Sequence, residues 1–461
     1  MRQRSAGEKV TGAISWTLVP RATQLCVSVV TSIFIVRTLG QYNYGTLSVL
    51  RTILAVGVVF LGFGLGHAIN RFVPELRVTG PREGGRRLLL RSLRLQFALW
   101  AGVCALLLLL RPLLLERFPT YADLLILGSL LSILEVTAGT LNQYALATYR
   151  AREMALANSF SALVLAGALA GLLRSGLLVE GVLLASAISN LAIVTLLSLS
   201  LRRSFRDAAT PPASPAPSLT DPAALAPAGD LSAAPMPPER GAGSGMFPWK
   251  RLLAYALPWI PNNILLYVIW RQSETLLLGI YRTREEAGLF DLAYKLPQMV
   301  LEFVPGAVYP LVLAGFAETA TRAKERMPEV IATFYRLLFF VVAPLSVMGM
   351  AMGDLLLRTM YGADMAGAGI YCQAFFLIFA LSFFGTPLSM TVYIVEKVWI
   401  NLVLNIAYGV VTIGLDLILI PRYGLLGATI PTGIVTALTP IVRYLVARRY
   451  MSGITIPWRF I

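Results

Sequence analysis

Several charged side chains stand inside long apolar stretches of this sequence, and they are the residues best placed to do chemistry. Arg21, Arg51 and Arg271 each lie well within such a stretch. A charge in apolar surroundings is costly unless it pairs with another group or binds a ligand. Because the planar guanidinium meets phosphate through two parallel N–H bonds, these three arginines are candidate contacts for an anionic ligand.

Carboxylates occupy similar positions. Glu135 lies near the middle of one apolar stretch, Glu302 near the middle of another, and Asp416 near the end of a third. A buried carboxylate can exchange a proton or hold Na⁺, so all three are candidate ion-coupling residues. Glu135 is the strongest of them because it has no basic residue within one helical turn. The alternative is a carboxylate paired with an arginine on another helix.

Two local pairs compete with these ligand-binding roles. Asp291 and Lys295 are four residues apart, a helical spacing that predicts a structural ion pair. Arg271 and Glu274 are three residues apart and could neutralise each other, which would leave Arg271 with no ligand to bind.

Enzyme chemistry finds little support in the sequence. His67 is the only histidine, so histidine-based triads and multi-histidine metal sites are excluded, and we expect His67 to be an interfacial residue rather than a proton relay. The three cysteines stand within apolar runs without CxxC spacing, and no GxxxxGK[ST] motif occurs. We therefore predict no catalytic residue, no metal and no cofactor.

The composition identifies the environment that holds these side chains. Of 461 residues, 57% are hydrophobic and 14% charged, with a mean hydropathy of +0.71. A soluble domain carries roughly 25% charged residues. The chain is therefore predicted to be an integral membrane protein. The net charge of +15 does not indicate nucleic-acid binding, because the basic residues lie mostly in short loops between apolar runs.

Twelve apolar runs are long enough to span a bilayer, which needs about 20 residues each. They are 12–36, 44–66, 92–115, 121–146, 155–173, 178–201, 252–280, 287–313, 334–352, 368–394, 400–420 and 425–446. Lysine and arginine are concentrated in the segments on the side of the N-terminus, which predicts that both termini are cytoplasmic.

A Pro/Ala-rich segment divides these runs into two sets of six. It covers residues 204–249 and has no aromatic residue between Phe205 and Phe247, so we expect a disordered cytoplasmic linker. The predicted domains are an N-terminal six-helix bundle (1–203), this linker, and a C-terminal six-helix bundle with a short interfacial tail (250–461).

Weak internal similarity relates the two sets. The turn Arg174-Ser-Gly176-Leu-Leu178 matches Arg422-Tyr-Gly424-Leu-Leu426, and Tyr44-Gly45 matches Ala287-Gly288, both at a spacing of about 245 residues. Six helices is an even number, so both halves enter the membrane in the same sense. This predicts a parallel repeat with a pseudo-two-fold axis along the membrane normal, and a binding site between the halves.

Several segments also carry a family resemblance. In the first half they are RTLGQYNYG at 37–45, GFGL at 62–65 and NRFVPE at 70–75. In the second half they are RQSE at 271–274, LLG at 277–279, AGLFDLAYK at 287–295 and IPRYGLLG at 420–427. These segments resemble the oligosaccharide flippases, also called polysaccharide-biosynthesis export proteins, of the superfamily that includes multidrug (MATE) antiporters and lipid II flippases.

The resemblance implies a fold and a function. The fold is an all-α, MATE-like flippase of twelve membrane helices in two bundles. The function is to move undecaprenyl-pyrophosphate-linked oligosaccharide across the cytoplasmic (inner) membrane, driven by an ion gradient or the membrane potential. The implied partners are the polyprenyl-pyrophosphate-linked oligosaccharide, membrane lipid, and polymerase and chain-length proteins of the same pathway. Arg271, Arg51 and Arg21 would contact the pyrophosphate.

Two other functions remain open. A cation-coupled small-molecule antiporter or a lipid II flippase of the same superfamily would share the fold, and the antiporter would lack convergent arginines. A membrane polysaccharide polymerase is a more remote alternative, because it would need a large outside loop or carboxylate clusters near one membrane face, and the sequence has neither.

Overall fold

The computed structural model describes residues 6–79, 84–148, 150–207, 249–257, 259–261, 263, 273–322, 327–388 and 398–450, and every regular element among them is a helix. In this part of the chain, nine helices are long and apolar enough to cross a membrane. The predicted all-helical membrane fold is therefore confirmed.

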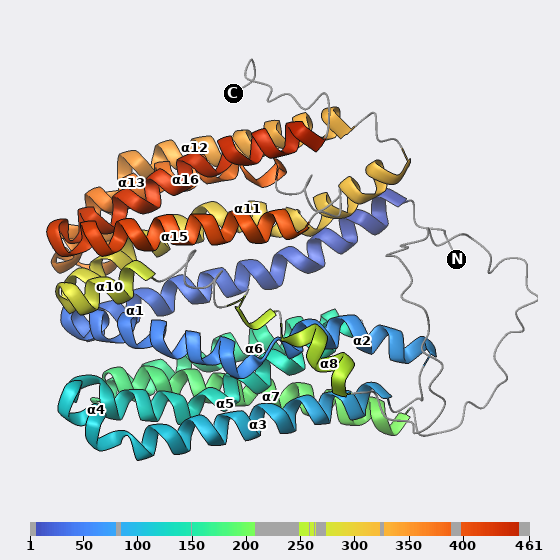
Figure 1. The fold of residues 1–461 in the computed structure, drawn as a ribbon, viewed down its shortest axis with the longest axis horizontal. Helices are drawn as coiled ribbons and strands as arrows, with labels where there is room; N and C mark the ends of the chain where they lie inside the picture. The colour runs from blue at the N-terminus through green and yellow to red at the C-terminus, as the bar shows by residue number, and fades with distance from the viewer. Residues whose placement is uncertain are drawn as a thin grey trace, which may run out of the picture.

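Two groups of helices follow the two halves of the sequence. The first group, here called the N-lobe, contains α1 (Ala6–Gly62), α2 (Leu65–Thr79), α3 (Gly84–Leu109), α4 (Arg111–Arg117), α5 (Pro119–Ala147), α6 (Ala151–Arg174) and α7 (Val179–Asp207). The second, the C-lobe, contains α10 (Ser273–Tyr281), α11 (Arg284–Arg322), α12 (Met327–Tyr361), the 3-10 helix η4 (Ala363–Ala368), α13 (Gly369–Phe383), α15 (Val398–Tyr423) and α16 (Leu425–Tyr450). Figure 1 shows the N-lobe below the C-lobe, with α1 between them.

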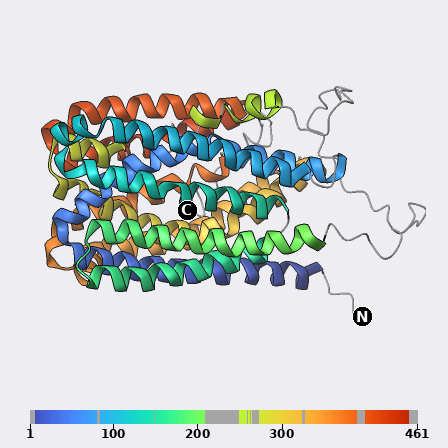
Figure 2. The ribbon, with the colours of Figure 1, turned by 90° about the horizontal axis from the view of Figure 1, so that it is seen from below.

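The twelve predicted runs all fall on helices, although 252–280 and 368–394 extend into residues outside the described ranges. The first two runs lie on α1, which bends at Gly40 with φ 69°. A side chain would be strained at this φ, and glycine is not. Figures 1 and 2 show the chain reaching one end of the molecule at this bend and turning back.

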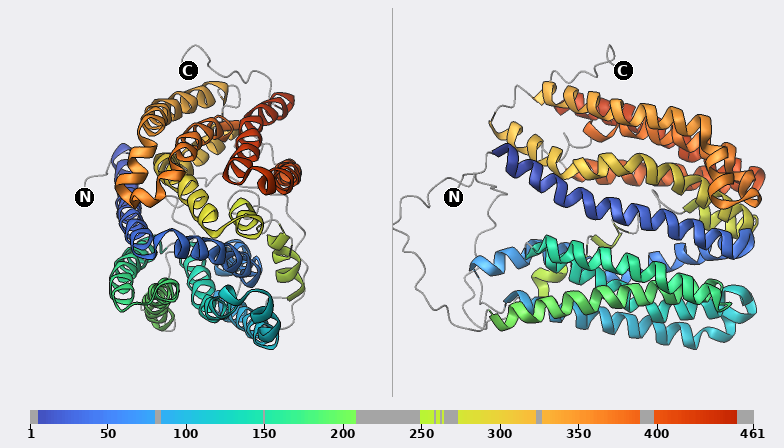
Figure 3. Two further views of the ribbon diagram at one scale, coloured as in Figure 1. Left: turned by 90° about the vertical axis from the view of Figure 1, so that its left-hand side faces the viewer. Right: turned by 180° about the vertical axis from the view of Figure 1, so that it is seen from behind.

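The ends of the molecule differ. The bend within α1 lies at one end, here called the far end, with the connections from α6 to α7 and from α15 to α16 (Figure 1). These connections contain Gly176 (φ 89°) and Gly424 (φ 57°). These two glycines are the pair matched in the internal repeat, and each connects two long helices. The opposite end, where α1 begins and α7 stops, is called the linker end (Figure 3).

Two apolar cores hold the helices together. One joins the lobes and includes Leu47 and Leu50 of α1 with Phe290 of α11 and Phe375 of α13. The other lies within the N-lobe, around residues of α2 such as Ile69.

A short helix of the second half joins the N-lobe core. It is α8 (Trp249–Ala256), and its Leu252 and Ala256 are fully buried in that core. The prediction had grouped this segment with the C-terminal bundle. Of the predicted linker 204–249, residues 204–207 are helical as the end of α7, and Trp249 begins α8. Residues 208–248 lie outside the described residues, so their predicted disorder remains a prediction.

Candidate functional site

The lobes meet most closely where α1 contacts α11, and glycines allow this approach. A Cβ atom on Gly45 would overlap the main-chain carbonyl of Arg284, and one on Gly288 would lie 3.0 Å from the Cα of Gly45. Gly45 and Gly288 are also the pair matched in the internal repeat. Two equivalent backbones, one from each half, are therefore in direct contact near the far end.

Asp291 of α11 forms the polar centre of this contact. Its Oδ2 accepts hydrogen bonds from Tyr44 Oη (2.6 Å) and Ser48 Oγ (3.0 Å), both on α1, and from Lys295 Nζ (2.6 Å). Asp291 and Tyr44 are each 3% exposed. The structure thus brings Asp291 and Lys295 together as the spacing predicted, and adds two donors from the other lobe. A buried charge is tolerated when it is hydrogen-bonded in this way.

Polar residues continue along α11 from this contact. Asp291, Lys295, Gln298 and Glu302 follow the spacing of one helical face. Their exposure rises from 3% at Asp291 through 33% at the Lys295 side chain to an exposed Glu302. Gln298 Nε2 donates to Glu302 Oε1 at 3.2 Å. The face that is sealed against α1 at Asp291 is therefore open toward the linker end.

Arg51 lies on α1 close to this polar face. It is half-buried and comes one turn after Ser48. Its charge acts on Tyr44 and on Glu135 of α5. Among the described residues, however, Arg51 takes part in no hydrogen bond or ion pair. The exposed Glu135, predicted to lack a local basic partner, thus has an arginine of another helix nearby without a direct pair.

Two further predicted arginines cannot be compared in the same way. Arg21 has a helical backbone on α1, but its side chain is outside what the structure describes. Arg271 lies entirely outside the described residues, so its pairing with Glu274 is untested.

Further side-chain contacts join the lobes at the far end, and the sequence analysis did not predict them. Arg284 donates to Tyr42 Oη and, at 2.9 Å, to Thr120 Oγ1, and its guanidinium lies 4.9 Å from the ring centre of Tyr121. Arg37 Nε donates to the carbonyl of Met360, near the end of α12, at 2.8 Å. These contacts join α1 and α5 of the N-lobe to the C-lobe.

A second polar site lies inside the C-lobe. Glu274 of α10 is 4% exposed and accepts hydrogen bonds from Thr432 Oγ1 of α16 (2.8 Å) and Ser273 Oγ (3.2 Å). Asp416 of α15 is fully buried and interacts electrostatically with Glu274. Neither oxygen of Asp416 has a hydrogen-bond partner among the described residues.

Among the described residues, no hydrogen-bond donor with a positive charge balances the carboxylates of Glu274 and Asp416. Two charged carboxylates that are buried close together repel, and the described donors to Glu274, two hydroxyls and its own backbone N–H, are all neutral. A shared proton or a bound cation would satisfy both groups. Carboxylate and hydroxyl oxygens are ligands that suit hard cations. Asp416 was predicted as a coupling residue; Glu274 was not, because its local spacing to Arg271 suggested a simple pair.

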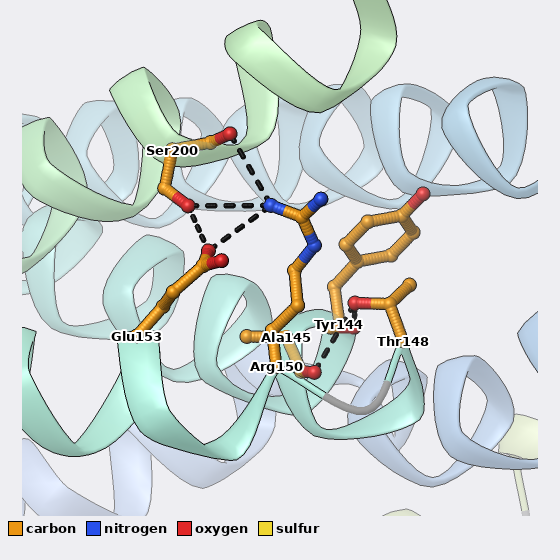
Figure 4. A network of polar contacts seen from close by, with 6 residues as sticks. All are labelled: Tyr144, Ala145, Thr148, Arg150, Glu153 and Ser200. Atoms are coloured by element: carbon orange, nitrogen blue, oxygen red, sulfur yellow. Dashed lines mark hydrogen bonds and ion pairs between the residues drawn. The ribbon is translucent and has the colours of Figure 1, made fainter. Parts of the chain in front are cut away.

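A third network lies at the linker end of the N-lobe (Figure 4). Arg150 Nη1 donates to Glu153 Oε2 at 3.0 Å and to the carbonyl and hydroxyl oxygens of Ser200 at 3.3 Å. Glu153 also accepts a hydrogen bond from Ser200 Oγ. The network joins the start of α6 to α7 within one lobe, so we assign it a structural role.

Comparisons with known proteins agree with this architecture. Residues 245–368 match a family model described as polysaccharide biosynthesis protein. A search of curated proteins found no match. Over residues 245–368, this match agrees with the family resemblance noted in the sequence.

Solved structures of transporters share the fold at low sequence identity. An inward-facing MATE family multidrug resistance transporter of the MOP superfamily is 15% identical over 96% of this chain and 98% of its own, with a TM-score of 0.67. An outward-facing structure of the same description is 15% identical over 96% of this chain and 96% of its own, with a TM-score of 0.63. The lipid II flippase MurJ, in an inward closed conformation, is 13% identical over 97% of this chain and 88% of its own, with a TM-score of 0.62.

Proposed function

We propose that this multi-pass membrane protein of the flippase type moves undecaprenyl-pyrophosphate-linked oligosaccharide repeat units across the cytoplasmic membrane for surface polysaccharide biosynthesis. The match to a polysaccharide biosynthesis family and the transporter fold support the general class. The finer substrate is our inference from the charged groups between the lobes. Alternating access would carry the headgroup through this space while the polyprenyl tail stays in lipid.

The proposal rests mainly on the environment of Arg51. It is half-buried in an apolar helix and forms no ion pair among the described residues. A charge held at this depth without a partner is expected to have a ligand. A pyrophosphate matches its fork of N–H donors. Arg21 and Arg271 are proposed as further headgroup contacts from helices of the two halves.

Ion coupling is the second part of the proposal. We assign it first to the buried pair Glu274 and Asp416, because each change of occupancy by a proton or Na⁺ would alter the repulsion between them. Glu135 remains a coupling candidate through its neighbour Arg51. Glu302, which is exposed and accepts a hydrogen bond from Gln298, is better placed to contact polar parts of the cargo.

The distribution of lysine and arginine supports an orientation with both termini, and therefore the linker end, in the cytoplasm. Cargo would enter from that side. The far end, where Asp291 joins the lobes, would then face outward.

Reconstitution tests the substrate directly. The purified protein in liposomes is given a fluorescent polyprenyl-pyrophosphate oligosaccharide in the outer leaflet, and its movement is followed by quenching. We expect movement that depends on the protein and is inhibited by excess polyprenyl pyrophosphate. Efflux of cationic dyes without movement of the lipid-linked sugar would contradict the proposal and favour a small-molecule antiporter. Movement of lipid II alone would favour a lipid II flippase.

A further inference from the structure

Lys295 differs from its ion-pair partner in exposure. The Lys295 side chain is 33% exposed, whereas the Asp291 side chain to which it donates is 3% exposed. An ammonium group carries several N–H donors, and among the described residues Lys295 uses one of them, to Asp291 Oδ2 at 2.6 Å. The other donors of Lys295 are therefore available toward the open part of the space between the lobes.

The two helices at the lobe contact run in the same direction, away from the far end. Gly45 of α1 lies against Gly288 of α11, and about one turn further along both helices Ser48 Oγ donates to Asp291 Oδ2 at 3.0 Å. The contacts advance together along the two helices, so residues that follow them by one more turn lie at a similar depth.

At that depth each lobe contributes one cation. Arg51 follows Ser48 by three residues. Lys295 follows Asp291 by four, so both cations stand on the helical faces that form the lobe contact. Arg51 is half-buried, and no hydrogen bond or ion pair holds it within the part of the chain that the structure describes. Glu135 of α5, on which its charge acts, is exposed and forms no direct pair with it. An anion between the lobes would thus meet a guanidinium from one lobe and an ammonium from the other.

Asp291 depends on Lys295 for its charge balance. Its other donors are the hydroxyls of Tyr44 and Ser48, which are neutral. An anion that draws the Lys295 ammonium away would leave the buried carboxylate with no cation bonded to it. Removing one partner of a buried ion pair is strongly destabilising, because the remaining charge is neither paired nor hydrated. Separation of α1 from α11 would admit water to Asp291, so loss of Lys295 favours an open far end.

We infer that Lys295 is a second contact for the cargo pyrophosphate, beside Arg51, and that its transfer from Asp291 to the pyrophosphate opens the far end. The inference rests on the proposed function for the identity of the cargo. It deepens that function, because it couples the arrival of cargo to the opening of the lobe contact. Without cargo, Lys295 stays on Asp291 and the far end stays closed.

Thiol labelling of the full-length chain tests this coupling. Cys26, Cys104 and Cys372 are replaced by serine, and Leu47→Cys supplies one thiol that is fully buried in the closed contact. In lipid nanodiscs we expect polyprenyl pyrophosphate to accelerate labelling by a membrane-impermeant reagent by roughly tenfold, within the usual range of coupling between a ligand and a conformational change. Uncharged polyprenol should have no effect.

Variants at Lys295 separate cargo binding from simple ion pairing. Lys295→Met should label rapidly without cargo, and polyprenyl pyrophosphate should add little, because Asp291 has already lost its cation. Lys295→Met combined with Asp291→Asn should label slowly again and remain insensitive to cargo, because the buried charge is gone. Lys295→Arg keeps a cation that can pair with either Asp291 or phosphate, so it should retain the response.

Arg358→Met is the matched control. Arg358 pairs with Asp354 at the same i, i+4 spacing, at 2.9 Å, but the two side chains are 56% and 34% exposed. Both residues lie on α12 of the C-lobe. Loss of this pair should therefore leave the labelling rate and the response to polyprenyl pyrophosphate unchanged.

Two results would overturn the inference. One is labelling that polyprenyl pyrophosphate does not accelerate in the parent chain, and the other is an equal acceleration in Lys295→Met. Lys295 would then be only the structural partner of Asp291. Transport of lipid-linked oligosaccharide without accelerated labelling would keep the proposed function and reject the inference. Acceleration without movement of the lipid-linked sugar would keep the role of Lys295 and reject the proposed cargo.

Discussion

The hydroxyl of Tyr44 and the carboxylate of Asp291, 247 residues apart in sequence, form a 2.6 Å hydrogen bond between the two lobes. Tyr44 directly precedes Gly45, and Asp291 lies about one helical turn after Gly288, the two glycines that bring α1 and α11 into contact. The polar bond and the close backbone approach therefore act at one place. In the alternating-access mechanism that we propose, this place has to open, so its stability would set the balance between states that are open at opposite ends.

Tyr44→Phe should weaken this contact without removing the ring. Loss of a hydrogen bond to a charged acceptor costs about 1.5–3 kcal/mol. We expect more molecules with the far end open, measured as faster labelling of Leu47→Cys, which is fully buried in the closed contact, by a membrane-impermeant thiol reagent. Tyr281→Phe, at an exposed position on α10, is the control. An unchanged labelling rate in Tyr44→Phe would show that the hydrogen bond does not hold the contact.

Gly45→Ala should force the same two helices apart. The added methyl group would overlap the carbonyl of Arg284, and such overpacking typically costs about 1–3 kcal/mol. Labelling of Leu47→Cys should therefore also rise, and transport should fall. Gly57→Ala on the same helix is the matched control, because a Cβ there meets no atom within 4 Å. If both substitutions behaved alike, the effect would come from helix propensity and not from the lobe contact.

The sequence predicted the membrane fold well because membrane helices require long apolar runs, which are visible in composition alone. It also predicted the internal repeat, through the turn glycines Gly176 and Gly424. It could not predict that α8 packs on the N-lobe, because an amphipathic segment does not specify which lobe it contacts.

The sequence predicted the contacts of the candidate site only where the two partners are close together in the chain. Asp291 and Lys295 stand one turn apart, so their pairing was predicted from spacing. Tyr44 and Ser48 were missed because their partner lies in the other half of the chain. Their spacing with Arg51 on one helical face was the available signal. The interaction of Glu274 with Asp416 was not predicted because Asp416 lies on a distant helix, and the alternative pairing of Glu274 with Arg271 remains untested.

Transport should be fastest with arginine at position 51, slower in Arg51→Lys and slowest in Arg51→Ala. Lysine keeps the charge but loses the fork geometry, and alanine loses both. An unpaired charge on the cargo would then cost about 2–5 kcal/mol. The measurement is the initial rate of movement of lipid-linked oligosaccharide in proteoliposomes with equal protein levels.

A double substitution separates cargo binding by Arg51 from simple charge balance. Glu135 is the carboxylate on which Arg51 acts. If Arg51 only balances Glu135, then Arg51→Ala combined with Glu135→Ala should restore transport. We expect no rescue. Glu135→Gln alone should keep normal membrane levels and change the dependence of transport on pH or Na⁺.

Asp416→Asn and Glu274→Gln should each abolish ion coupling while the protein remains folded. Each change removes one of two repelling buried carboxylates, so stability should stay the same or rise. The readout is the dependence of transport on an imposed Na⁺ or proton gradient, together with the melting temperature in detergent. Thr432→Val, which removes a donor to Glu274 but no charge, should weaken ion dependence less. Normal coupling in Asp416→Asn would exclude the pair as the coupling site.

Deletion of most of residues 208–240 should leave transport largely intact. The segment is rich in Pro and Ala, which gives it no apolar face to pack. Helix α7 before the linker and α8 after it both pack in the N-lobe, so a shortened linker does not have to bridge the two lobes. The measurement is transport by the deletion variant at equal membrane levels, beside a variant with a Gly/Ser segment of the original length. Loss of transport in both variants would show that the linker sequence itself is required, whereas loss only in the deletion would show that transport needs a linker of the original length.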